Sequence, residues 1–279
     1  MLNKLDKIML AVLLALLVTS GGIHWQDRVE QPVEPEAVAQ VAVGEVAAQP
    51  ESMVPDFGSM MDVKAKKNAF FGYLHPLVEK ENDVILKNRQ HIIALSSLAE
   101  LTENDKVWLA NLAKKYRLRA VSVFDEAFFQ ALLTRVDMIP PSLALAQSAN
   151  ETAWGTSRFA RQGNNFFGQW CFSSGCGIVP AARPEGKTYE VQKFEDVAAS
   201  VRAYMHNLNT NHQYEVLREL RGKRRITKAF ITGPVLAHGL YAYSIRGVEY
   251  VDELLSMINS NDLLQYDLDN QAELVTGNP

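Results

Sequence analysis

Cysteine is scarce in this sequence, since only Cys171 and Cys176 occur among its 279 residues. Two cysteines are too few for a mini-domain held together by disulfides, or for a structural zinc site built on cysteine pairs. A surplus of positive charge is also lacking, because 28 Lys and Arg stand against 32 Asp and Glu, giving a net charge of −4. Such a chain offers no global field for a polyanion, so we expect no nucleic-acid partner.

The overall composition is that of a folded protein. Hydrophobic residues make up 47% of the chain and charged residues 22%, which excludes a chain disordered throughout. One hydrophobic core of moderate size must therefore hold the fold. At about 150 residues per domain, the length allows one or two domains.

Residues 1–25 predict an export signal or a membrane anchor. Lys4 and Lys7 precede an uncharged, apolar run from Ile8 to Val18. The run is shorter than the roughly 20 residues that span a bilayer, which favours a cleaved signal peptide. No A-x-A cleavage site follows it, which favours an uncleaved anchor. Both alternatives send the rest of the chain across a membrane.

Residues 26–57 predict a flexible, disordered tether. From Gln26 to about Pro55 the chain contains prolines, glutamates and many small residues, and no aromatic side chain. Such a segment buries too little apolar area to offset the entropy lost on ordering. A tether of this kind would let a membrane-attached domain reach a distant substrate.

Residues 58–139 predict a helical extension. Apolar residues recur there at helical spacing on three stripes: Val78, Ile85, Ile92 and Leu95; Trp108, Leu112 and Tyr116; Phe124, Phe128, Leu132 and Val136. Pro140 and Pro141 then break the chain, and Pro141 suits the first turn of the next helix. That helix begins a second region, residues 140–265, and residues 266–279 are left as a fraying acidic tail.

Within residues 140–265 the helical pattern is interrupted once. Glycines and prolines punctuate the segment from Gly163 to Phe194, which predicts a small hairpin lobe. Helical spacing returns afterwards and continues to about Leu264, with a loop expected near Gly233 and Pro234. The fold class is therefore mainly α, with a small β-hairpin.

Glu151 is the side chain with the most distinctive surroundings. It follows a run of Ala and Leu residues and precedes Trp154, so its carboxylate is expected beside small apolar groups and an indole. Burial of that kind disfavours the charged form and raises the pKa, as a general acid working at neutral pH requires. A solvated surface glutamate is the alternative.

The sequence motifs around Glu151 resemble those of a known family. Ala146-Gln-Ser-Ala-Asn-Glu-Thr-Ala-Trp-Gly155, followed by Asn164-Asn-Phe-Phe-Gly168, is similar to the motifs of the glucosaminidase family of bacterial cell-wall hydrolases. The Bax-type proteins of Gram-negative bacteria look most alike, and the likeness covers about Pro140 to Met257. It implies a lysozyme-like fold, in which a helical lobe and a small β-lobe border a cleft for a glycan.

The resemblance also implies site residues. Glu151 matches the catalytic acid, although Thr152 follows it where the family usually has Ser. Asn165, Phe167 and Gly168 match the cleft motif, with architecture as the alternative role. Three aromatic side chains are expected to stack on sugar rings, or else to belong to the core: Phe167, Trp170 and Tyr189. Trp154 is a further candidate for substrate binding.

A second catalytic group is also implied. Inverting glycosidases place a second carboxylate about 6.5 to 9.5 Å from the acid, and retaining ones about 5 to 5.5 Å. Glu190 matches the hairpin acid of the family, while Glu185, Glu195 and Asp196 are alternatives. Tyr243 fits a functional tyrosine of the family inexactly, and a core role is equally compatible with its sequence context.

The two cysteines and a basic run complete the candidates. Cys171 and Cys176 flank a tight loop that a disulfide could close, with free thiols or a metal pair as alternatives. The basic run could contact anionic wall polymers or form a solvated helix face: Arg218, Arg221, Lys223, Arg224, Arg225 and Lys228.

Together these features predict a peptidoglycan hydrolase of the endo-beta-N-acetylglucosaminidase type, in the periplasm, secreted or anchored to the inner membrane. Its partners would be glycan strands and, through the N-terminal segment, the membrane, with no cofactor and no metal. One alternative is lytic transglycosylase cleavage by the same acid. Another is a non-catalytic glycan-binding or assembly protein with a lysozyme-like fold.

Overall fold

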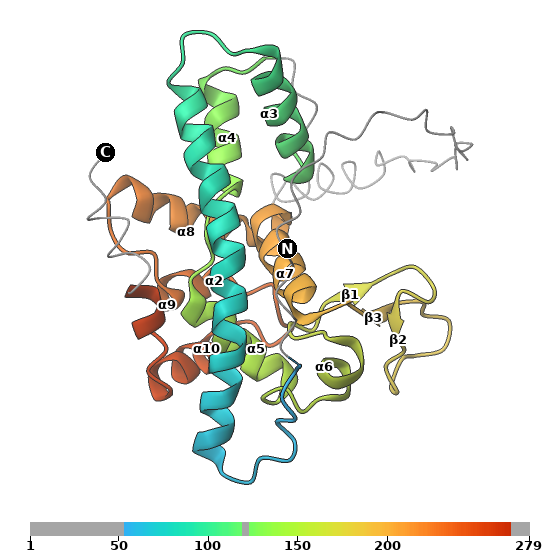
Figure 1. Ribbon diagram of the computed structural model, residues 1–279. Coiled ribbons are helices and arrows are strands. Elements are labelled where there is room, and N and C mark those ends of the chain that lie inside the picture. Colours follow the sequence, from blue (N-terminus) through green and yellow to red (C-terminus); the bar gives the residue numbers. More distant parts are fainter. Residues whose placement is uncertain (1–52, 119–122, 269–279) are drawn as a thin grey trace, which may run out of the picture. The chain divides into compact units, whose positions relative to one another are not determined.

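The computed structural model describes residues 53–118 and 123–268 (Figure 1). The predicted export segment, residues 1–25, and almost all of the predicted tether lie outside these residues. In the described ranges, no helix is long and apolar enough to cross a membrane.

The described chain is mainly α-helical with one small antiparallel sheet, so the predicted lysozyme-like fold class is confirmed. The helices are α2 (Val63–Ser96), α3 (Glu103–Lys115), α4 (Glu126–Arg135), α5 (Pro141–Thr152), α6 (Arg158–Gly163), α7 (Val197–Thr210), the 3-10 helix η1 (His212–Tyr214), α8 (Glu215–Ile226), α9 (Gly233–Ala237) and α10 (Val248–Ser260). The strands are β1 (Trp170–Cys171), β2 (Gly177–Ile178) and β3 (Glu190–Gln192).

Helix α5 lies at the centre of the fold. Its residues from Pro141 to Ala149 are all buried, as expected for a helix of Ala, Leu and Ser that is weakly polar on every side. Pro141 occupies the first turn as predicted, because a missing N–H costs nothing there. Helices α2, α9 and α10 pack around α5, so the end of α5 is held on several sides (Figure 1).

Helix α2 is the longest element and buries one stripe along its length. The Asp62 side chain caps its start by accepting a hydrogen bond from the Ala65 N–H at 2.6 Å. The buried face includes the predicted stripe, Val78, Ile85, Ile92 and Leu95. It packs against α4, α5 and α7.

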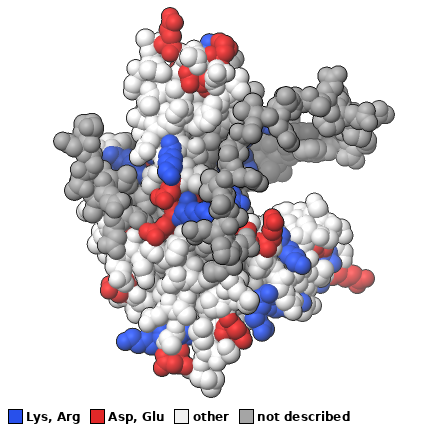
Figure 2. Space-filling model, viewed as in Figure 1, with Lys and Arg blue, Asp and Glu red and all other residues white. Residues whose placement is uncertain are grey.

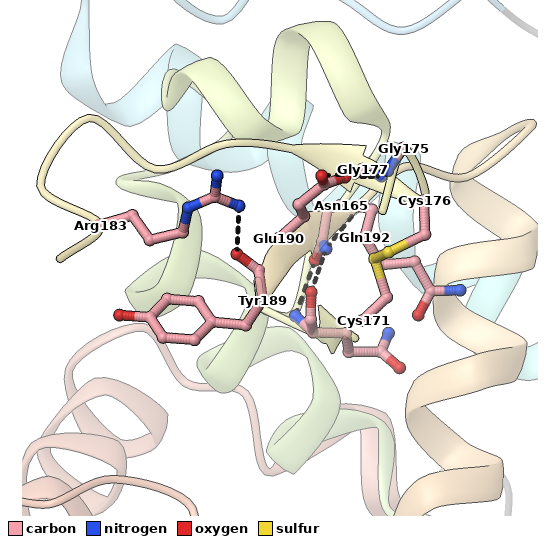
Figure 3. The surroundings of a disulfide bond; sticks show 10 residues. Asn165, Cys171, Gly175, Cys176, Gly177, Arg183, Tyr189, Glu190 and Gln192 are labelled. Carbon is pink, nitrogen blue, oxygen red and sulfur yellow. Dashed lines mark hydrogen bonds between the residues drawn. A yellow bond between two sulfur atoms is a disulfide. The ribbon is translucent and has the colours of Figure 1, made fainter. Parts of the chain in front are cut away.

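The small lobe is a three-stranded sheet in the order β1-β3-β2. Trp170 pairs with Val191 and Cys171 with Glu190, while Ile178 pairs with Val191 from the other side. Figure 3 shows the disulfide that joins Cys171 to Cys176 and so closes the loop between β1 and β2. This is the first of the three alternatives considered for the two cysteines.

One hydrophobic core crosses the predicted boundary at residue 140. Buried side chains of α2, such as Ile85, belong to the same cluster as Leu145 of α5 and Ile258 of α10. Phe57, assigned to the tether, is only 1% exposed and its ring packs edge-on against Phe70. The predicted tether therefore cannot extend to residue 57, because the Phe57 side chain is part of the core.

The predicted acidic tail also needs correction at its start. Asp267 is fully buried, and its carboxylate accepts hydrogen bonds from the Ser142 N–H at 2.9 Å and the Gly233 N–H at 2.8 Å. It therefore links the first turns of α5 and α9. The loop expected near Gly233 is itself the short helix α9.

The basic run is not a solvated face throughout. Arg218 and Arg221 are buried, and Arg225 forms an ion pair with the buried Asp137 at 2.7 Å. Burial alone would raise the pKa of Asp137, but Arg221, Arg225 and Arg89 together hold it below its usual value. On the face drawn in Figure 2, coloured basic and acidic side chains lie interspersed.

Candidate active site

Glu151 lies in the last turn of α5, where the helix stops abruptly. The Thr152 hydroxyl donates to the Ser148 carbonyl at 2.6 Å and accepts from the Gly155 N–H at 2.8 Å. Ala153, Trp154 and Gly155 then all have positive φ, so the chain reverses direction directly after Glu151. The threonine that replaces the usual serine keeps the hydroxyl that this turn uses.

A cleft of about 490 Å³ opens beside the half-buried Glu151 side chain. Its walls come from both lobes: the segment 167–172 and β3 on one side, and α7, η1 and residues 242–243 on the other. The second wall carries three amide side chains beside His206, Tyr214 and Tyr243: Asn207, Asn211 and Gln213. Arg117 also lines the cleft, and the amides and hydroxyls beside the acid suit a hydroxyl-rich ligand.

Gly168 leaves room for the carboxylate of Glu151. A Cβ atom at position 168 would lie 2.9 Å from the Glu151 Oε2, closer than real Cβ contacts allow. Gly168 also has φ +62, a conformation that costs other residues about 1–2 kcal/mol. Both observations explain why a glycine stands here.

Glu151 has a raised pKa for an identifiable reason. Burial disfavours its charged form, and this effect outweighs the hydrogen bond from Tyr250 and the attraction of Arg246, which both favour the carboxylate. Glu253 adds a smaller repulsion in the same direction as burial. A carboxyl group that retains its proton at higher pH is what general acid catalysis requires.

A chain of buried hydrogen bonds leads to this carboxylate. The Tyr250 hydroxyl donates to Glu151 Oε1 at 2.9 Å, and the Gln147 Nε2 donates to the Tyr250 oxygen at 2.9 Å. The Tyr204 hydroxyl donates to Gln147 Oε1 at 2.6 Å. Neither Tyr250 nor Gln147 was predicted as a site residue from the sequence, although Gln147 precedes Glu151 by four residues and so shares its helix face.

Comparisons with known proteins agree with this geometry. The family described as Mannosyl-glycoprotein endo-beta-N-acetylglucosaminidase matches residues 126–263, from the start of α4 to beyond α10. The chain is also 30% identical over 213 residues to Protein bax of Escherichia coli (strain K12), which covers 76% of each chain. The chain belongs to the glucosaminidase family. It is thus a glycosidase-type enzyme, and no solved structure matches it.

Tyr243 contributes to this glucosaminidase site without touching Glu151. Its hydroxyl donates to the Phe167 carbonyl at 2.7 Å, and its ring stacks on Tyr250 at 5.6 Å. The contact joins the segment after α9 to the cleft motif. Of the two tyrosines, Tyr250 is the one that donates a hydrogen bond to Glu151.

Two motif residues have mainly architectural contacts in this glucosaminidase fold. Asn165 is 1% exposed, donates to the carbonyls of Gln169 and Gln192, and accepts from the Gln169 N–H, which ties β3 to the cleft segment. Phe167 is buried and stacks on Tyr204 at 3.9 Å, while its backbone borders the cleft.

The two tryptophans lie in different surroundings. Trp170 is 49% exposed and lines the cleft, packed edge-on against Tyr189. Trp154 turns the other way and packs against Phe70 and Phe71 of α2. Trp154 is therefore not among the described residues that line the cleft beside Glu151, and its role in substrate binding stays a prediction.

Glu190 lies in β3, and its carboxylate is directed at the disulfide loop (Figure 3). It accepts from the Gly175 N–H at 3.0 Å and from the Gly177 N–H at 2.8 Å. These bonds hold its pKa below the usual value. Within the described ranges, Glu190 is not among the residues that line the cleft, so its part in water activation stays a prediction.

The same loop contains a cluster of three potential metal-ligand residues, Cys171, Cys176 and Glu190, whose ligand atoms lie within 4.8 Å of one another. Both sulfur atoms are consumed by the disulfide, and both carboxylate oxygens are bonded to backbone N–H groups. Cysteine binds a metal ion as a thiolate, which a disulfide cannot supply, so this donor set does not fit a metal ion.

Proposed function

We propose that the chain is a peptidoglycan hydrolase that cleaves the glycosidic bond after N-acetylglucosamine, with Glu151 as the general acid. The observation that carries the proposal is the position of Glu151, a half-buried carboxyl with a raised pKa at the border of a cleft between two lobes. Membership of the glucosaminidase family supports a glycan as the substrate.

The proposed step begins when a glycan strand lies in the cleft. Glu151 transfers its proton to the glycosidic oxygen as the bond from that oxygen to the anomeric carbon breaks. A water molecule then adds its oxygen to the anomeric carbon and releases one proton to solvent, from which the Glu151 carboxylate regains its own. The products are one new reducing end and one free hydroxyl, and no cofactor takes part.

Two groups could assist the attacking water. Glu190 is the carboxylate suggested by the family resemblance, but the disulfide loop would have to release its two backbone hydrogen bonds first. The acetamido group of the substrate needs no such rearrangement. The geometry therefore favours assistance by the substrate, with Glu190 holding the loop.

The cleft supports sugar binding through two kinds of contact. The exposed face of Trp170 offers a surface on which a pyranose ring can stack. The amides of Asn207, Asn211 and Gln213 can both donate to and accept from sugar hydroxyl and acetamido groups. Gly168 leaves room for the Glu151 carboxylate at the border of the cleft.

The proposal also includes export to the periplasm, with the domain secreted or held at the inner membrane. It is supported by the apolar run after Lys4 and Lys7 and by the tether-like composition that follows. A disulfide is compatible with such an oxidising compartment.

The test is digestion of purified Gram-negative peptidoglycan by the full-length chain and by its Glu151→Gln variant, with mass analysis of the fragments. Reducing-end N-acetylglucosamine from the unmodified chain, reduced at least 100-fold by the substitution, is the expected result. Glu100→Gln is the matched control, because it makes the same chemical change at an exposed bend that does not line the cleft.

Other products would overturn the proposal. Anhydro-sugar ends would show transglycosylase cleavage by the same acid. Wall binding by both proteins without any release would identify a glycan-binding protein instead.

A further inference from the structure

The hydrogen bonds between Tyr204, Gln147, Tyr250 and Glu151 all run in one direction. Tyr204 donates to Gln147, Gln147 donates to Tyr250, and Tyr250 donates to Glu151. The first three residues are at most 1% exposed, so water does not compete for these groups. Their elements are α7, α5 and α10, which the core holds together.

The direction of the chain follows from the chemistry of its members. A tyrosine hydroxyl has a single proton, whereas a glutamine amide has a separate donor and acceptor. The Gln147 Oε1 accepts the Tyr204 proton, and in the described part of the chain no other acceptor is bonded to that hydroxyl. This fixes the Gln147 Nε2 toward Tyr250, whose own proton can then point only to Glu151.

The carboxyl group of Glu151 has two oxygens with different surroundings. Oε1 accepts from Tyr250, so it is the poorer site for a proton. Oε2 lies where a Cβ on Gly168 would be 2.9 Å away, at the border of the cleft. A proton on Oε2 is therefore next to the position of a bound sugar.

We propose that Tyr204, Gln147 and Tyr250 are positioning residues that keep the catalytic proton on the Glu151 Oε2. The proposal rests on the function proposed above for Glu151 and deepens it. Tyr204 and Gln147 act through Tyr250 and have no contact with the substrate cleft of their own in this role.

Several other charged or titratable groups face Glu151 and must be held constant in a test. The segment before α10 contributes Tyr243 and Arg246, η1 contributes Tyr214, and α10 contributes Glu253. Arg246 lowers and Glu253 raises the pKa of Glu151, and the two side chains form an ion pair with each other. The Tyr250 hydrogen bond favours the carboxylate, so its loss raises the pKa of Glu151 further.

The test uses the full-length protein with Tyr250→Phe, Tyr204→Phe and, as an isosteric second probe of the middle link, Gln147→Met. The Glu151 titration is followed by infrared difference spectroscopy against Glu151→Gln, and the alkaline limb of kcat/KM is measured on peptidoglycan. We expect Tyr250→Phe to move both upward by about one pH unit, since a hydrogen bond to a charged group is worth about 1.5 kcal/mol or more. Tyr204→Phe and Gln147→Met should move them about half as far.

Tyr116→Phe is the matched control, because it removes the hydroxyl of another buried tyrosine that is not part of the hydrogen-bond series from Tyr204 to Glu151. It should leave the Glu151 titration unchanged, while thermal unfolding reports any general loss of stability. Tyr204→Phe keeps the ring that stacks on Phe167, which preserves local packing.

An unmoved titration in Tyr250→Phe would overturn the proposal entirely. If the Glu151 titration shifts in Tyr250→Phe but not in Tyr204→Phe or Gln147→Met, the proposed role of Tyr204 and Gln147 is overturned. The infrared titration does not depend on turnover. If the Glu151 titration shifts as predicted in a protein that cleaves no peptidoglycan, the positioning role of the three residues is supported and the proposed function is overturned.

Discussion

At the scale of single residues, position 168 shows how an absent side chain serves the site. The Glu151 Oε2 occupies the space that a Cβ would need, and the backbone has a φ that favours glycine. These two constraints differ in consequence, because the first concerns the carboxylate and the second concerns only folding. A substitution can separate them.

Gly168→Ala is expected to lower peptidoglycan cleavage at least tenfold, because the added methyl group displaces Oε2 from the cleft. The backbone strain should lower the free energy of unfolding by about 1–2 kcal/mol. Cleavage rates and denaturant unfolding measure the two effects. Gly186→Ala is the control, since it has φ +79 and no atom within 4 Å of the added Cβ. Equal loss of activity in both variants would contradict the steric explanation.

Some residues of the site could be predicted from the sequence, but their contacts could not. Glu151 and Gly168 stood out through the composition around them and through a motif that fixes their order. Tyr250 did not, because its contact with Glu151 spans 99 residues and depends on how α10 packs on α5. Local pattern carries no information about such a pairing.

At the scale of elements, the β-lobe is organised around Glu190. Strand alternation places Glu190 on the opposite face from Tyr189 and Val191, and a charged residue on such a face is expected to be exposed to solvent. The residue is only 5% exposed because the disulfide loop folds over it and supplies two backbone donors. A loop that returns over its own strand has no periodic signature, so sequence could not reveal this burial.

Activity of Glu190→Ala, measured with and without sodium azide, shows whether Glu190 acts as a catalytic base or only anchors the disulfide loop. If Glu190 only anchors the loop, azide should restore no activity, and the double variant Cys171→Ser, Cys176→Ser should lower activity to a similar extent while keeping the carboxylate. Cleavage rates and the azide-substituted sugar, detected by mass, are the measurements. Recovery of activity through a glycosyl azide would instead assign Glu190 to the chemistry.

At the scale of the whole molecule, helical periodicity predicted the buried faces but not what covers them. The stripe of α2 was correctly identified, yet it was assigned to an extension separate from the catalytic region. In the structure this stripe packs on α5 and α7, which contribute Glu151 and Tyr204 to the site. Proline residues at 140 and 141 mark the start of a helix there, and a domain boundary leaves the same mark in a sequence.

The packing of α2 leads to a prediction about truncation. A chain that begins at Glu126, where the family match starts, lacks α2 and exposes one side of α5. Burial of each large apolar side chain contributes about 1.5–3 kcal/mol, so the α2 face is worth as much as the roughly 5–15 kcal/mol that stabilise a typical domain. We expect this chain to show no cooperative thermal transition and to bind a hydrophobic dye.

A chain that begins at Met53 is the matched control, because it keeps Phe57 and all of α2. It should unfold in one sharp transition by calorimetry and retain cleavage. If the shorter chain unfolds just as sharply and cleaves peptidoglycan, α2 is not required for the catalytic fold. If it does not, the helix that precedes the family's own boundary is part of the catalytic fold, since it supports the helix that presents Glu151.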